Sequence, residues 1–146
     1  MDFSKIDTFI KEDIHKEIYQ TYARGTKSNI DVEDVPFRNH LDLWMLGFCI
    51  AIKKDLKPIS KDYKGVRAIQ GQVFVENQII ESIIKLILID KSKNEEILLN
   101  PNKIHAEAND LSLAGINYVK DFINKDPDES NLDNLLDSMV DILGKE

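Results

Sequence analysis

The chain has 146 residues, of which 42% are hydrophobic and 31% are charged, and its formal net charge is −7. This length suits one domain with one hydrophobic core, and the composition excludes a disordered, collagen-like or disulfide-stapled protein. An acidic chain is repelled by phosphate backbones, so nucleic-acid binding would require a local basic patch. We therefore predict a single helical domain over residues 1–146.

The N-terminus and the one cysteine predict a cytoplasmic location. Residues 1–5 lack the basic start and apolar run of a signal peptide, and no apolar stretch approaches the ~20 residues that cross a bilayer. Cys49 excludes an intrachain disulfide, and its neighbours Phe48 and Ile50 predict a buried thiol. We expect no membrane partner.

The first predicted element is an amphipathic helix over residues 4–23. Ser4 can cap its start, and Gly25 can supply the left-handed conformation that ends it. Its apolar residues recur every three or four positions and so share one helical face: Ile6, Phe9, Ile10, Ile14, Ile18 and Tyr22.

A turn-rich stretch over residues 26–37 then predicts a connecting loop. After Asn39, apolar residues from position 41 to position 52 occupy every side of a helix. A helix that is apolar all round is typically buried. We therefore expect residues 41–54 to form the central, buried helix of the fold.

Residues 53–67 form the one basic segment, with six positive and two negative side chains and a local charge of +4. Pro58 and Gly65 favour a loop. The segment is either a solvated loop that closes the buried helix or a loop that contacts the phosphates of DNA. The candidate nucleic-acid contacts include one aromatic residue that can stack on a base: Lys53, Lys54, Lys57, Lys61, Tyr63, Lys64 and Arg67.

The next stretch, residues 69–75, is ambiguous. Val73, Phe74 and Val75 favour a strand, but the run is too short to exclude the start of a helix. We expect a short strand or hairpin near residues 66–75. Residues 77–90 then form a helix whose face carries isoleucines: Ile79, Ile80, Ile83, Ile84 and Ile87.

Two further helices complete the chain. Asn100 and Pro101 are typical of a helix start, and apolar residues follow at alternating steps of four and three up to Phe122. The last helix begins near Asp126 or Asp128 and ends at Gly144. Its predicted buried face holds six apolar residues: Leu132, Leu135, Leu136, Met139, Val140 and Leu143. The predicted fold is therefore mostly α, a compact bundle of about five helices around residues 41–54.

The sequence carries no pattern of catalytic or metal-binding residues. The glycines do not form a phosphate-binding loop, and His15, His40 and His105 lack the partners that metal motifs require. We predict no catalytic residue, no cofactor and no metal site, although a hydrolase site built from scattered carboxylates stays open.

The last helix carries an acidic ridge. Asp133, Asp137 and Asp141 are spaced by four residues, so they form one row, which we expect to lie opposite the apolar stripe. The row is either a solvated helix face or a docking surface for a basic partner, or it mimics the charge of DNA.

Two stretches carry a family resemblance: VPFRNHLDLWMLG over residues 35–47, and AEANDLSLAG over residues 106–115 followed by the last helix. They resemble the small helical accessory proteins encoded beside bacterial DNA-phosphorothioation (dnd) systems. The resemblance implies a supporting part in modification-linked restriction or antiphage defence, with no catalytic residues.

We therefore expect a non-enzymatic accessory or adaptor protein that binds larger protein components of such a system. The alternative is a small DNA-binding regulator that uses the basic segment of residues 53–67.

Overall fold

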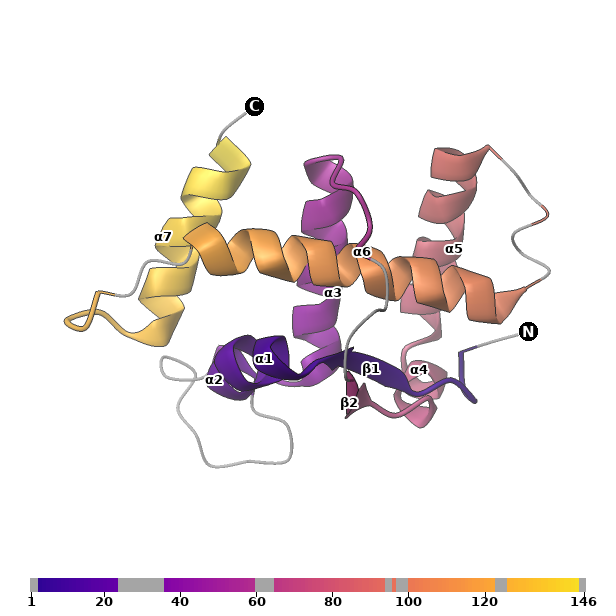
Figure 1. The fold of residues 1–146 in the computed structure, drawn as a ribbon, viewed down its shortest axis with the longest axis horizontal. Coiled ribbons are helices and arrows are strands. Elements are labelled where there is room, and N and C mark those ends of the chain that lie inside the picture. Colours follow the sequence, from indigo (N-terminus) through magenta and orange to yellow (C-terminus); the bar gives the residue numbers. More distant parts are fainter. Residues whose placement is uncertain are drawn as a thin grey trace.

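The computed structural model describes residues 3–23, 36–59, 65–93, 96, 100–122 and 126–144. Helices make up most of this part of the chain, and a small two-stranded sheet lies at one edge of them, which confirms the mostly α fold (Figure 1). In chain order the elements are β1 (Thr8–Lys11), α1 (Glu12–Ile14), the π-helical η1 (His15–Tyr19), α2 (Gln20–Tyr22), α3 (His40–Lys53), β2 (Gly65–Ile69), α4 (Gln72–Glu76), α5 (Gln78–Ser92), α6 (Pro101–Phe122) and α7 (Asn131–Gly144).

The core is organised by the crossing of α3 and α6, which Figure 1 shows at the centre of the molecule. Gly47 of α3 and Gly115 of α6 meet at this crossing. A Cβ atom on Gly47 would lie 2.5 Å from the backbone oxygen of Ser112, and one on Gly115 would overlap the carbonyl group of Gly47. The two backbones touch because neither position has a side chain.

Buried polar side chains fix the register of this crossing. The Ser112 hydroxyl donates to the carbonyl oxygen of Trp44 at 2.7 Å, and the Trp44 indole Nε1 donates to Asn109 Oδ1 at 2.9 Å. Asn109 Nδ2 in turn donates to the carbonyl oxygen of Phe9 at 2.8 Å. One asparagine therefore ties α3, α6 and β1 together, and these polar groups are satisfied by the fold itself.

The sheet corrects the prediction for the N-terminal region. Residues 8–11 are not helical but form β1, in which Thr8 and Ile10 are buried and Phe9 between them is exposed. Helical structure begins only at Glu12. The apolar residues of this stretch satisfy both a helical period and the two-residue period of a strand, and antiparallel pairing with β2 decides between them.

The strand expected near residues 66–75 is confirmed in its first half and wrong in its second. Residues 65–69 form β2, which pairs with the distant β1 and not with a neighbouring hairpin strand. Val73, Phe74 and Val75 belong to the short helix α4. Phe74 is buried there against the rings of Phe3 and Trp44, so tertiary packing overrides the strand propensity.

The central helix is confirmed over His40–Lys53, with Asn39 Oδ1 accepting from the backbone N–H of Asp42 at 2.9 Å as its cap. Its burial is uneven. The side towards α6 is enclosed, whereas Cys49 is exposed, so the prediction of a buried thiol is wrong. An apolar side chain on either side of a residue along a helix does not place that residue on the covered face.

The last two helices lie where the sequence predicts them, apart from one boundary. Asn100 Oδ1 accepts from the N–H of Lys103 at 3.2 Å and caps α6. Helix α7 begins at Asn131 and not near Asp126, because the hydroxyl of Ser130 accepts from the N–H of Asp133 at 3.1 Å. Gly25 and most of the predicted loop of residues 26–37 lie outside the described residues.

Candidate interaction surfaces

The histidines of the described chain take part in packing. His105 is buried among the rings of Phe3, Trp44 and Phe74, and its Nε2 lies 2.8 Å from the hydroxyl of Thr8. His40 donates from Nδ1 to the carbonyl oxygen of Ala68 at 2.9 Å. No three His, Cys, Asp or Glu side chains converge on a metal-sized site within the residues that the structure describes.

Cys49 is exposed on α3, but its environment does not activate it. Partial burial of the thiol raises the pKa of Cys49 above its ordinary value. The protonated thiol is a poor nucleophile. Its position therefore does not resemble that of a reactive cysteine.

The basic segment does not form one patch in its described part. Lys53 ends α3, and Lys54 and Lys57 follow it. Arg67 lies in β2, next to Ala68, whose carbonyl oxygen is bound by the first residue of α3. Lys53, Lys54 and Lys57 therefore lie at the end of α3, whereas Arg67 lies near its start. The two ends of α3 are about 20 Å apart, because a helix rises 1.5 Å per residue.

Arg67 is also engaged by an acidic residue. Its Nη1 lies 3.5 Å from Oδ2 of Asp7, while Oδ1 of Asp7 accepts from the N–H of Gly71 at 2.9 Å. This pair joins the start of β1 to the end of β2. The other candidate contacts, Lys61, Tyr63 and Lys64, lie outside the described residues.

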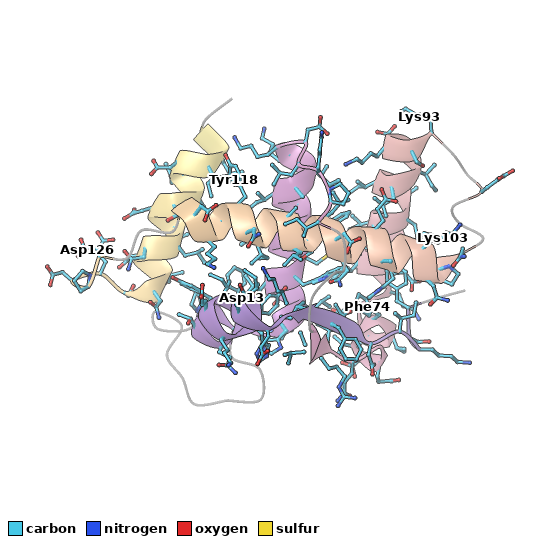
Figure 2. The ribbon with its side chains drawn as sticks, in the orientation of Figure 1. Asp13, Phe74, Lys93, Lys103, Tyr118 and Asp126 are labelled. Atoms are coloured by element: carbon cyan, nitrogen blue, oxygen red, sulfur yellow. The ribbon has the colours of Figure 1, made fainter. Side chains whose placement is uncertain are left out.

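The acidic ridge lies on the surface of α7. Asp133, Asp137 and Asp141 are all exposed. Glu129, in the turn before α7, forms a side-chain hydrogen bond with Asp137, which together with the nearby carboxylates raises the pKa of Glu129. Figure 2 shows Asp126 at this same end of the molecule. The ridge is therefore part of a larger group of carboxylates.

The predicted buried face of α7 is wrong in half of its members. Leu136, Val140 and Leu143 are 51%, 71% and 50% exposed. The covered side instead carries Leu135 and Ile142 together with two polar residues: Asn134 and Ser138. The apolar arc of α7 is thus wider than the part that the core covers, and one edge of it faces outwards.

Helix α5 leaves a second apolar stripe uncovered. Ile84 and Leu88 enter the core, whereas Ile79 and Leu86 are 72% and 67% exposed. Ile83 and Val75 of α4 extend the stripe and are also exposed. The periodicity of the sequence predicts a single isoleucine face here, and the structure divides it between the core and the surface.

The two stripes lie at opposite ends of α6 (Figure 1), because α5 packs near its start and α7 near its end. Lys93, at the end of α5, and Asp126, before α7, mark these two ends in Figure 2. We call Val75, Ile79, Ile83 and Leu86 the α5 stripe, and Leu136, Val140 and Leu143 the α7 stripe.

A polar cleft of about 430 Å³ lies between α2, the end of α6 and the turn before α7. Its volume falls in the range of small-molecule pockets. Glu17 and Lys120 are both among its lining residues and bind each other at 2.7 Å, and Asp126 and Glu129 add further carboxylates. Most of the lining residues are polar, and we assign no ligand to the cleft.

Comparison of the chain with known protein families, with curated proteins and with solved structures gives no match. The resemblance to dnd-associated accessory proteins therefore stays a prediction from the sequence. No helix in the described ranges combines the length and the apolar character needed to cross a membrane.

Proposed function

We propose that this protein is a non-enzymatic accessory protein that binds larger protein components of a prokaryotic DNA-modification, restriction or antiphage defence system in the cytoplasm. The biological setting is inferred from the resemblance of residues 35–47 and 106–115 to dnd-associated proteins. The mode of action, docking to other proteins, is inferred from the surface of the molecule.

The observation that carries the proposal is the pair of exposed apolar stripes on α5 and α7. Apolar residues that lie together on a surface mark sites of interaction more often than single exposed ones. Each stripe is held on a helix whose other side enters the core, through Leu88 in α5 and Ile142 in α7. Both surfaces are therefore formed before a partner binds, which lowers the entropic cost of association.

The position of the stripes supports an adaptor that contacts two partners. They lie at the two ends of α6, the longest helix of the described chain, which spans 22 residues. A helix of that length measures about 33 Å. Partners bound at the two ends would be separated by α6, so both could bind at once.

The buried polar groups support a structural role for the interior. Asn109 and Ser112 bind backbone or indole groups of neighbouring elements, and His105 packs in an aromatic cluster with Thr8 at its Nε2. Each of these contacts stabilises the crossing of α3, α6 and β1.

Protein is better supported than DNA as the direct ligand. The described basic residues of the segment 53–67 lie at the two ends of α3, and Arg67 is paired with Asp7. The carboxylates of α7 would repel a phosphate backbone. A DNA-binding regulator should instead show gel retardation that weakens steeply with salt and that is lost on charge reversal at Lys61, Lys64 and Arg67.

The test is affinity capture of the tagged chain, expressed in its native host, followed by identification of the bound proteins by mass spectrometry. We expect the wild type to retain components of a DNA-modifying or DNA-cleaving system. Ile79→Gln/Leu86→Gln and Leu136→Gln/Val140→Gln should each lose a bound protein without loss of helical circular dichroism. The matched control is Gln78→Ala/Ser82→Ala, because Gln78 and Ser82 are also exposed on α5. This control should retain the proteins that the two stripe variants lose.

Recovery of no DNA-processing protein would contradict the biological setting. Full retention of every bound protein by both stripe variants would contradict the docking role of the stripes.

A further inference from the structure

We propose that the α7 surface, formed by the α7 stripe and the acidic row Asp133, Asp137 and Asp141, binds a basic amphipathic helix of a partner protein. This inference rests on the proposed accessory function and specifies the chemistry of the partner at one of its two surfaces.

The spacing of the side chains suits a helical ligand. Leu136, Val140 and Leu143 follow one another at steps of four and three, so they form one continuous stripe on α7. The stripe is about 10 Å long, since a helix rises 1.5 Å per residue. Helices that dock on such surfaces use anchors at i, i+3 or i+4, and i+7, which cover the same length.

The acidic row lies beside the stripe and not opposite it. Asp133 lies three residues before Leu136, and Asp137 lies three residues before Val140, so two of the three exposed apolar residues have a neighbouring carboxylate. No basic residue lies in the last turn of α7, and Asn131–Gly144 contains neither lysine nor arginine. A ligand on the stripe therefore meets negative charge beside Leu136 and Val140.

The carboxylates at this surface repel one another. The hydrogen bond to Asp137, partial desolvation and the charges of Asp137, Asp126 and Asp133 raise the pKa of Glu129, as expected where carboxylates lie close together. Lysine or arginine side chains on a ligand would relieve this repulsion. Complementary charge also speeds association and excludes wrong partners.

The same charges disfavour the other occupants of an exposed apolar stripe. Pairing of two α7 surfaces would bring two acidic rows together, and anionic lipid or nucleic acid would be repelled. The α5 stripe differs, because the carboxylate of Asp90, one helical turn after Leu86, is bound by Lys93 at 2.8 Å. Only the α7 stripe thus combines exposed apolar residues with a row of unneutralised carboxylates in the described part of the chain.

The experiment measures binding of a fluorescent helical peptide to the full chain by anisotropy. The peptide carries leucines at i, i+4 and i+7 and lysines in the adjoining row, and a second peptide has glutamates in place of the lysines. We expect the lysine peptide to bind with an affinity that falls with salt and the glutamate peptide to bind at least about tenfold more weakly.

The variant Asp133→Asn/Asp137→Asn/Asp141→Asn keeps the shape of the row and removes its charge. It should weaken binding of the lysine peptide about tenfold, as expected from three exposed charge pairs, and flatten the salt dependence. The control Asp55→Asn/Glu76→Gln/Glu107→Gln changes the net charge equally but away from α7. It should change the affinity less than about twofold, because these residues lie after α3, in α4 and in the first half of α6, and none belongs to α7 or its acidic row.

Equal binding of the two peptides would overturn the proposal, because the charge of the ligand would then not matter. Equal weakening by the two triple variants would also overturn it, because the net charge of the protein, and not the acidic row of α7, would then attract the peptide. A dimer in sedimentation that Leu136→Gln/Val140→Gln dissociates would also overturn it and make a second copy the occupant. If Leu136→Gln/Val140→Gln loses a captured protein but the asparagine variant keeps it, the accessory function stands and the basic partner is wrong. If neither variant loses a captured protein, the docking role of α7 itself fails.

Discussion

Helices α3 and α7 both carry apolar residues on more than one narrow face, yet the core covers these residues to different extents. In α3 the core covers most of the helix, including Trp44 and Phe48, which are fully buried. In α7 the core covers Leu135 and Ile142 and leaves Val140 outside. A helical apolar pattern therefore predicts which side chains favour burial, and not which of them the core of this chain covers.

The difference arises from what each helix packs against. Gly47 lets α3 approach α6 until their backbones touch, so side chains on either side of the crossing are enclosed. The covered side of α7 instead holds Asn134, which exchanges hydrogen bonds with the backbone of Asp126 at 3.1 and 3.3 Å. That contact fixes the turn before α7 and leaves the far edge of its apolar arc outside the core.

The largest effect should come from breaking the crossing with Gly115→Ala. The added methyl group would overlap the carbonyl group of Gly47, and neither helix can move without separating the buried residues around it. We expect a loss of about 3 kcal/mol or more in the free energy of unfolding, or failure to fold. Urea denaturation followed by circular dichroism measures this.

Gly144→Ala is the matched control, because a Cβ atom there meets nothing within 4 Å. It should change stability by less than about 1 kcal/mol. Equal stability of the two variants would show that α3 and α6 are not in backbone contact.

The next effect tests the polar groups of the crossing. Asn109→Ala should cost about 2–4 kcal/mol, because it leaves the Trp44 indole N–H and the Phe9 carbonyl oxygen buried without these bonds. Ser82→Ala, which removes an exposed hydrogen bond within α5, should change stability by less than about 0.5 kcal/mol. Similar values for the two would refute the tie between α3, α6 and β1.

A smaller effect is expected from pH. Partial burial and the neighbouring His40 ring, 5.9 Å away, lower the pKa of His15 below its ordinary value of 6.5. The unfolded chain therefore takes up this proton first, so stability falls as the pH drops below 6.5. His15→Gln should reduce that loss between pH 6.5 and about pH 5. If His15→Gln and the wild type show the same pH dependence of stability in urea titrations, His15 does not cause the loss at low pH.

The long elements of the fold could be predicted from the sequence, because their signals agree. Asn100 and Pro101 start α6, and a regular apolar period continues to its end. Helix α3 follows the cap Asn39. The strand β1 could not be predicted, because its pairing with β2 joins residues about sixty positions apart and only the folded chain brings them together.

The surfaces were harder to predict than the elements. The basic segment is continuous in the sequence, but α3 separates Lys53 from Arg67 along its length. The apolar stripe of α7 was expected inside because periodicity identifies a face without showing what covers it. The exposure of Asp133, Asp137 and Asp141 could be predicted, because unpaired carboxylates are rarely buried whatever the packing of the helix.

The most direct measurement is the free energy of unfolding of Leu136→Gln/Val140→Gln, compared with Ile142→Ala on the covered side of the same helix. If the α7 stripe serves binding and not folding, the double variant should lose less than about 1 kcal/mol, while Ile142→Ala loses about 2–5 kcal/mol. A loss above about 2 kcal/mol in the double variant would show that these side chains belong to the core, and α7 would then present no docking surface.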